Sequence, residues 1–385
     1  MSQDRLLLQQ AGVDYPAKLA SAENGVRHTA DVVEQILVHA CAYYAIARKE
    51  VEAFARATES ASGAVGDADH AHLTHAMKHF VRDYSTEGAF ERKRTFGLIQ
   101  GWLAQEFPEG GRESMKILLP GCGVGGLLWE VAAMGFEVAG VEWSFWMNIM
   151  HHFVASAGPV PIVDTELGVN GDIDEHKKQH TIYPYIDWWS HHITHSNMTR
   201  PIRFPHSYAP LPPATPLPSS PDTVSALIDT HHTHHVSLYE SDFTTIHPPS
   251  SPPQYTCIIT LFFLDTAQSL PTYIRKIHDY LLPGGVWINL GPLLYEGEPS
   301  VELSLGEVLA TAEGMGFIFD DIVEKMRQEG PKEGWIEGSG DYDGWADTLG
   351  DGKVAGLRAG YNIDWKGIGR NDYVAQAWVA RKGKY

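Results

Sequence analysis

The feature that most constrains the fold is a glycine-rich turn between an apolar run and a helical run. Residues 116–144 read KILLPGCGVGGLLWEVAAMGFEVAGVEWS, and the apolar run at 116–120 predicts a buried strand. Gly121, Gly123 and Gly125 follow it, and glycines let the backbone approach a ligand at the N-terminus of the next helix, where N–H groups lack partners. The stretch therefore predicts the first strand, turn and helix of a nucleotide-binding α/β unit.

An acid follows this turn at the end of the second predicted strand, 137–142. Glu142 lies twenty-one residues after Gly121, where a carboxylate accepts hydrogen bonds from both hydroxyls of a ribose. The three glycines Gly121, Gly123 and Gly125 have the spacing G-x-G-x-G. Nicotinamide enzymes and S-adenosylmethionine (SAM) methyltransferases share this pairing of a glycine turn with a ribose-binding acid.

Two later patterns favour SAM over a dinucleotide. SDF at 241–243 is an acid followed by an aromatic residue, in the place where methyltransferases hold adenine. LLPGGVWINLGPLL at 281–294 is a Pro-Gly-Gly turn that leads into a strong strand, as is common late in that sheet. A dinucleotide needs a second set of phosphate-binding groups, and this half of the chain has none evident. The alternative is that the glycines only form tight turns.

Composition excludes several classes of protein. The chain has 385 residues, of which 43% are hydrophobic and 11% aromatic, enough for a buried core. A net charge of −19 argues against nucleic-acid or anionic-membrane partners, which need a basic footprint. Cys41, Cys122 and Cys257 are few and far apart, as in proteins of a reducing compartment. With no targeting or membrane segment evident, we expect a cytoplasmic protein, with the nucleus as the second candidate location.

Helical periodicity dominates the first part of the chain. Residues 30–58 predict one long amphipathic helix, a second run begins near His72, and AFERKRTFGLIQGWLAQEF continues as a third. We therefore expect an N-terminal helical cap at 1–105. Residues 106–385 are expected to form a SAM methyltransferase domain with an α/β, Rossmann-like sheet. Its strands are predicted at 116–120, 137–142, 255–262 and 285–290, and its helices near 125–134, 143–156, 268–281 and 303–316.

A long Pro-, His- and Ser-rich insertion at 158–253 interrupts the predicted sheet. Its aromatic front, TIYPYIDWWSHH, is expected to pack as a lid, and 209–226 is expected to be mobile. HHTHH at 231–235 suits a metal site or a solvated loop. No cysteine or spaced carboxylate set accompanies these histidines, so we predict no metal.

Several longer motifs resemble the carnosine N-methyltransferase family, SAM enzymes that methylate the imidazole of a histidine-containing dipeptide. The resemblance covers most of 30–320 and the C-terminal strand. VEWSFWM, FFLDTA and WINLGPLLY together are specific to that family. The motifs are FVRDYSTEGAFER (80–92), ILLPGCGVGGLLWEVAAMGFEVAGVEWSFWM (117–147), YPYI (183–186), RPIRFP (200–205), SDF (241–243), FFLDTA (262–267) and LLPGGVWINLGPLLY (281–295).

The resemblance implies a set of cofactor contacts. It places Arg82 near the SAM carboxylate, which a guanidinium fork binds in a bidentate manner. The family usually carries glutamine where this chain has His79. The remaining implied contacts are Gly121 with the amino-acid part of SAM, Glu142 with the ribose, Asp242 and Phe243 with adenine, and the backbone at Thr260 or Leu261.

For the methyl acceptor, the resemblance implies Asp265 and Tyr373, and Tyr295 joins them as a positioning group. A carboxylate that accepts the imidazole N–H selects the tautomer and stabilises the positive charge that develops on the ring. The family has a histidine after GPLLY, whereas this chain has Glu296. The segment 329–367 is also longer than expected for the family. Both departures favour an acceptor other than carnosine.

Each of these residues has a plainer alternative. Asp265 suits a helix cap, Tyr373 a core strand position and Glu296 a solvated turn, while Arg82 suits a structural ion pair with Asp83. A group of aromatic residues near the lid suits either a cation-binding wall or a core. These aromatic residues are Tyr183, Tyr185, Trp188 and Trp189.

The sequence thus predicts a SAM-dependent N-methyltransferase that acts on an imidazole nitrogen and leaves S-adenosyl-L-homocysteine. Two alternatives stay open. One is the same fold methylating a different small-molecule or secondary-metabolite acceptor, and the other is a non-catalytic SAM-binding protein. The expected partner is a small molecule or dipeptide, with no nucleic acid and no membrane. The resemblance also makes a homodimer through the N-terminal helices an expectation.

Overall fold

The computed structural model describes most of the chain and divides it into two compact units. The described residues are 3–62, 67–156, 179–205, 228–229, 236–246, 255–295, 297–328, 336–337 and 344–384. Unit 1 comprises Met1–Ala89, Ile149–Pro210 and Asn362–Arg370, and unit 2 comprises Phe90–Asn148, Leu211–Tyr361 and Asn371–Tyr385. The first boundary therefore lies at Ala89 and not near residue 105. Residues 209–226 and the histidines at 231–235 lie outside the described residues.

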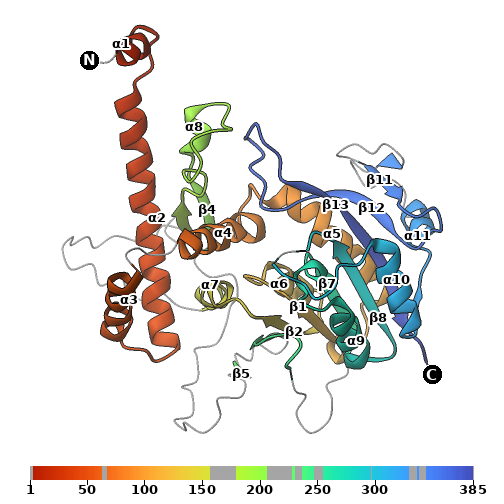
Figure 1. Cartoon of the computed structure of the whole chain (residues 1–385). Coiled ribbons are helices and arrows are strands. Elements are labelled where there is room, and N and C mark those ends of the chain that lie inside the picture. The colour runs from red at the N-terminus through yellow and green to blue at the C-terminus, as the bar shows by residue number, and fades with distance from the viewer. Residues whose placement is uncertain are drawn as a thin grey trace. The chain divides into compact units, whose positions relative to one another are not determined.

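Unit 1 is mainly helical (Figure 1). The predicted single helix over 30–58 is wrong, because the chain breaks between α2 and α3. Ala45 adopts a left-handed backbone with φ 53°, which a continuous α-helix does not allow. The elements are α1 Gln3–Gln10, α2 Tyr15–Tyr43, α3 Arg48–Ser62, α4 Asp67–Tyr84 and α8 His195–Met198, with strands β3 Gln179–Ile182 and β4 Ile202–Pro205.

Helix α2 begins at a capping residue and packs on the predicted lid front. The Asp14 side chain accepts a hydrogen bond from the Ala17 N–H at 3.0 Å, which satisfies one of the unpaired N–H groups at the helix start. A side chain in place of Gly25 would overlap Ile186. Strands β3 and β4 pair in an antiparallel ladder, and Phe204 of β4 stacks on Phe80 of α4 with ring centroids 4.4 Å apart.

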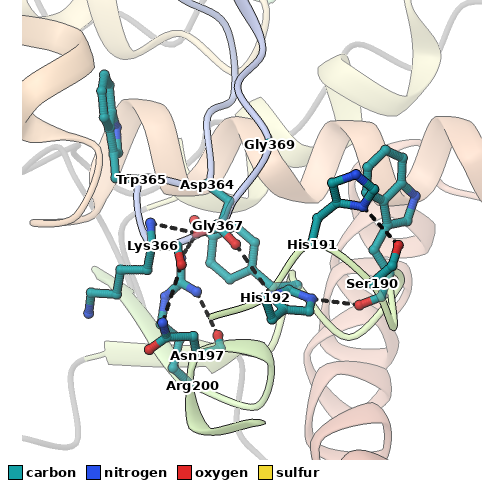
Figure 2. A network of polar contacts seen from close by, with 12 residues as sticks. Ser190, His191, His192, Asn197, Arg200, Asp364, Trp365, Lys366, Gly367 and Gly369 are labelled. Carbon is teal, nitrogen blue, oxygen red and sulfur yellow. Dashed lines mark hydrogen bonds and ion pairs between the residues drawn. The ribbon is translucent and has the colours of Figure 1, made fainter. Parts of the chain in front are cut away.

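Arg200 holds together three segments of unit 1 that are distant in sequence. Its guanidinium donates to Glu87 and, at 2.6 Å, to Asp364 in the loop between β12 and β13. It also lies 3.7 Å from the Tyr185 ring centroid, so a cation already covers one face of that ring. Figure 2 shows Arg200 between Asn197 and Asp364. The Arg200 side chain is only 9% exposed, and Lys366 Nζ lies 3.9 Å from Oε2 of Glu87 as a second cation.

We expect Arg200→Ala to lower the free energy of unfolding by about 2 kcal/mol, because the change takes the main cation from two half-buried carboxylates, Glu87 and Asp364. Urea denaturation measures this loss. Arg27→Ala is the matched control, since the ion pair of Arg27 with Glu23 is exposed to solvent. This variant should leave the unfolding midpoint unchanged. Equal midpoints for the two variants would show that the Arg200 network contributes nothing to stability.

Unit 2 is built on a large mixed sheet. The strand order is β10-β11-β12-β13-β8-β7-β1-β2-β6-β5, with β9 paired to β13. The strands β8, β7, β1, β2 and β6 run parallel to one another, whereas β13 runs antiparallel to β8. The strands are β1 Lys116–Pro120, β2 Glu137–Glu142, β5 Ile228–Asp229, β6 Val236–Glu240, β7 Tyr255–Leu261, β8 Leu281–Gly291, β9 Phe317–Phe319, β10 Ile336–Glu337, β11 Gly344–Asp347, β12 Ala355–Gly360 and β13 Asp372–Lys382.

Helices cover both faces of the sheet, with α5 and α6 on one face and α9 and α10 on the other (Figure 1). Side chains alternate between the faces along each strand. Ile117 and Leu119 therefore pack in the cluster with Trp102 of α5, and Leu118 packs in the cluster with Ile274 of α9. The helices of unit 2 are α5 Ala89–Glu106, η1 Arg112–Ser114, α6 Gly126–Ala133, η3 Leu264–Thr266, α9 Leu270–Tyr280, α10 Leu305–Gly314 and α11 Ile322–Gln328, and α7 Phe145–Ala155 passes from unit 2 to unit 1 at Ile149.

The elements predicted around the glycine turn are confirmed. The strands expected at 116–120 and 137–142 coincide with β1 and β2, and 255–262 differs from β7 by one residue. Strand β8 begins earlier than expected, at Leu281. The unusually long C-terminal segment supplies β10, β11 and β12, which extend the sheet beyond β13. None of the described helices combines the length and the apolar character that crossing a bilayer requires.

Candidate functional site

The glycine turn lies where the connections of the parallel sheet change direction. From β1 the chain proceeds through α6 to β2 on one side, while β7 lies against the other side of β1. In open parallel sheets, ligands bind beyond the carboxyl ends of the strands at such a point. The turn after β1, the end of β2 and the end of β7 all reach this edge of unit 2.

The backbone of the turn requires glycine. Gly121, Gly123 and Gly125 have φ values of 66°, 59° and 91°, which side chains disfavour. A Cβ atom on Gly121 would lie 2.5 Å from Cδ2 of Phe263. The turn thus folds tightly against the segment that follows β7, and Gly125 directly precedes the first residue of α6.

We expect Gly121→Ala to destabilise unit 2 by about 2 kcal/mol or more, because the methyl group adds left-handed strain to an overlap with Phe263. The matched control is Gly110→Ala, since a Cβ atom at Gly110 would meet nothing within 4 Å. Thermal unfolding followed by circular dichroism compares the two variants. A Gly121→Ala midpoint as high as that of Gly110→Ala would contradict the close approach of turn and Phe263.

The carboxylate of Glu142 accepts backbone hydrogen bonds from both sides of the turn. Its Oε2 accepts the Gly123 N–H at 2.8 Å, and its Oε1 accepts the Ser144 N–H at 2.7 Å. Burial raises the pKa of Glu142 above its ordinary value, although these N–H donors oppose the shift. Each oxygen has a further lone pair, so the carboxylate retains the capacity to accept the two hydroxyls of a ribose.

The acid and aromatic pair after β6 is held in a compact turn. Oδ1 of Asp242 accepts both the N–H of Thr244 at 2.7 Å and its hydroxyl at 2.8 Å. Phe243 is 3% exposed, and its ring makes edge contacts with the rings of Phe263 and Tyr273. Because that ring is packed inside unit 2, we expect any adenine contact at Phe243 to come from its backbone. The adenine role of this pair stays a prediction.

The end of β7 offers backbone rather than side-chain groups. The Thr260 hydroxyl donates to Asn289 Oδ1 at 2.8 Å and accepts the indole N–H of Trp287 at 2.9 Å, so it is fully used within the sheet. Leu261 is the last residue of β7 and is half-buried. The predicted approach of this segment to SAM through its backbone agrees with this arrangement but is not tested by it.

Asp265 lies just beyond β7, after a strained residue. Phe262 has φ 48°, and its N–H donates to Leu290 O at 2.9 Å. Asp265 is 8% exposed, and its Oδ2 accepts the Leu294 N–H at 3.3 Å. The capping alternative for Asp265 is wrong, because the residues that precede η3 and α9 are Phe263 and Ser269. Strained backbone of this kind clusters at functional sites.

The two candidate tyrosines lie in different surroundings. The Tyr295 hydroxyl donates to Leu303 O at 2.8 Å and accepts the Leu303 N–H at 3.2 Å, so it ties the segment after β8 to the start of α10. Tyr373 is half-buried on β13, and its ring centroid lies 6.3 Å from that of Phe262. Glu296 lies outside the described residues.

The remaining candidates belong to unit 1. Arg82 Nε donates to Asp83 Oδ1 at 2.5 Å, so the ion pair considered as an alternative is present. His79 is 3% exposed, and burial, followed by the charge of Arg82, holds its pKa well below the ordinary value. Trp188 and Trp189 are 61% and 43% exposed, so they are not core residues. The cofactor roles of His79 and Arg82 stay predictions.

Sequence reasoning missed the backbone partners of the two carboxylates. The N–H groups of Gly123 and Ser144 hold Glu142, and the N–H of Leu294 holds Asp265. The type of a residue does not reveal whether its backbone N–H binds a carboxylate. Among these three donors, only Gly123 was indicated, by the glycine spacing. Phe262 gave no signal either, since phenylalanine rarely adopts a positive φ.

The sheet order, the glycine turn and the half-buried acid at the end of β2 define an α/β protein of the Rossmann-like class. Residues 60–329 match the family described as Carnosine N-methyltransferase, and the chain belongs to that family. The mouse carnosine N-methyltransferase is 34% identical over 256 residues, 64% of this chain and 54% of the relative. The Drosophila melanogaster carnosine N-methyltransferase unmet is 26% identical over 313 residues, which are 80% of this chain and 54% of the relative.

The chain spans about half the length of these curated relatives. Among solved structures, a putative S-adenosylmethionine dependent methyltransferase from Listeria monocytogenes aligns over 73% of this chain and 96% of its own. The identity is 11% and the TM-score 0.34.

Proposed function

We propose that this protein is a SAM-dependent N-methyltransferase whose acceptor is an imidazole nitrogen of a carnosine-like dipeptide or related histidine-containing small molecule. The observation that carries the proposal is the pair of carboxylates at one edge of unit 2, the half-buried Glu142 at the end of β2 and the buried Asp265 after β7. Membership of the carnosine N-methyltransferase family supports it.

The groups around Glu142 fit the cofactor. A ribose needs a carboxylate with two accepting oxygens, and the Gly123 and Ser144 N–H groups hold the two oxygens of Glu142 in place. Glycine at position 121 lets the turn approach Phe263, in the segment that leads to Asp265. When bound, SAM would supply a sulfonium methyl group for in-line attack by a nitrogen lone pair, and S-adenosyl-L-homocysteine would leave with the electron pair of the broken S–C bond.

Asp265 would orient the acceptor. Neutral imidazole has one N–H and one lone pair. A carboxylate that accepts the N–H directs the lone pair away from itself and stabilises the positive charge that the ring gains. The Leu294 N–H donates to Oδ2 of Asp265, and Tyr373 would bound the acceptor site. Methyl transfer needs alignment and exclusion of water more than acid–base chemistry.

The purified chain, incubated with isotope-labelled SAM and carnosine, tests the proposal. We expect label in a product heavier by one methyl substituent, with the methyl group on an imidazole nitrogen. Label on a different acceptor from a cell extract would support the alternative that this fold methylates another small molecule. No transfer to any acceptor would refute the proposal. Light scattering on the same sample measures whether the chain forms the homodimer that we propose. Fractionation of cells measures the proposed cytoplasmic location.

A further inference from the structure

An apolar groove opens beside Asp265 on the face of the sheet that carries α10. Its volume is about 530 Å³. Leu293 and Leu294 after β8, Leu303 and Leu305 at the start of α10, and Val374 on β13 form its walls. Leu294 and Val374 are 56% and 57% exposed, so a bound apolar group would remove their side chains from water, which is favourable.

The groove offers a ligand no charge. Charged residues make up 20% of the chain, yet none of the described residues that line the groove is charged. Two of its polar side chains donate hydrogen bonds within the protein. The Ser304 hydroxyl donates to Glu307 at 2.7 Å, and Gln376 Nε2 donates to Val374 O at 2.8 Å. An amine or carboxylate placed there would lose hydration without meeting a charged partner among these lining residues, which is costly.

Two residues connect the groove to the proposed acceptor site. Leu294 forms part of its wall and also donates its N–H to Asp265 Oδ2 at 3.3 Å. Tyr373, the other residue assigned to the acceptor, lines the groove as well. A group attached to an imidazole held at Asp265 therefore has a neighbouring space that accepts hydrocarbon and rejects charge.

We propose that this groove binds an apolar side chain of the acceptor, so that the preferred substrates are histidine peptides with an apolar residue next to the histidine. This inference rests on the proposed function. It deepens that function, because carnosine itself offers no branched hydrocarbon to fill such a groove.

Two dipeptides, glycyl-histidine and leucyl-histidine, test the inference. They share the imidazole and the terminal charges and differ by one isobutyl group. We expect kcat/KM to be about tenfold higher for leucyl-histidine, mainly through KM, because burial of a few carbon atoms in an apolar pocket discriminates by that order. Val374→Trp, which fills the groove, should remove the advantage and leave the glycyl-histidine rate unchanged.

Ile318→Trp is the matched control, since Ile318 is an exposed β-branched residue on β9 that does not line the groove. The glycyl-histidine rate reports on the fold of each variant, and the smaller change Val374→Ala should halve or further reduce the leucyl-histidine advantage. Equal kcat/KM for the two peptides, or an advantage that survives Val374→Trp, overturns the inference. So does a change of oligomeric state in Val374→Trp, which would assign the groove to a second copy of the chain. Methylation of neither peptide counts instead against the proposed function.

Discussion

Glu142→Gln is expected to weaken SAM binding by about a hundredfold while the protein stays folded. The carboxylate would accept two ribose hydroxyls, and charge-assisted hydrogen bonds contribute about 1.5–3 kcal/mol each. An amide keeps the shape but has one accepting oxygen, and its NH₂ group would face either the Gly123 or the Ser144 N–H. Isothermal titration calorimetry with SAM measures the loss.

Glu240→Gln is the matched control for this variant. Glu240 pairs in register with Glu142 on the adjacent parallel strand and is likewise half-buried, so the change removes a carboxylate at the same level of the sheet. We expect the affinity for SAM to remain within about twofold. If Glu142→Gln and Glu240→Gln bind SAM equally well, Glu142 does not bind the ribose.

The raised pKa of Glu142 adds a pH dependence. Binding of the ribose uses the ionised carboxylate, so the affinity for SAM should fall with decreasing pH around a midpoint above 4.5, the ordinary pKa of glutamate. The effect on stability has the opposite sign. A carboxyl group whose pKa is raised by folding contributes stability that is complete below 4.5 and lost as the pH rises through the folded pKa. Glu142→Gln should abolish both trends in titrations across this range.

Asp265→Asn is expected to lower kcat by a factor of about 100 or more without changing the affinity for SAM. The carboxylate would stabilise the charge that the imidazole gains during methyl transfer, and loss of one such group costs on the order of a hundredfold in kcat. The amide oxygen of asparagine can still accept the Leu294 N–H, so the local structure should persist. Single-turnover kinetics with labelled SAM separate the chemical step from binding.

Asp279→Asn serves as the control, because Asp279 is an aspartate on α9 whose side chain is 61% exposed. Its turnover should equal that of the unmodified protein. An Asp265→Asn protein that turns over as fast as Asp279→Asn would remove Asp265 from the reaction. A variant that instead loses SAM affinity would indicate that Asp265 acts on the cofactor and not on the acceptor.

The first half of the sheet was predictable because its signals are local. Glycines at positive φ, apolar runs and an acid at a strand end act within about thirty residues, and β1, α6 and β2 follow from them. The helix break at Ala45 was not predictable in this way. The apolar periodicity continues through 44–47, and the left-handed residue there is an alanine, which has no special preference for that conformation.

The candidate site was likewise predictable only in part. The types of the two carboxylates and their places after β2 and β7 were readable from the residues. Their surroundings were not, as the Phe243 ring shows. An acid followed by an aromatic residue suggests an adenine contact, yet the packing of α9 buries that ring among Phe263 and Tyr273.

The sequence alone determined the Rossmann-like class, the glycine turn and the identity of the acids, since each depends on residue types at short spacing. Tertiary structure decided which backbone groups hold those acids and where an uncharged groove opens. The Leu294 N–H donates to Asp265, which lies 29 residues earlier in the chain, and Val374 on the last strand lines the groove. Such contacts between residues distant in sequence depend on the order of strands in the sheet. Strand order follows from the packing of the whole unit rather than from any local run of residues.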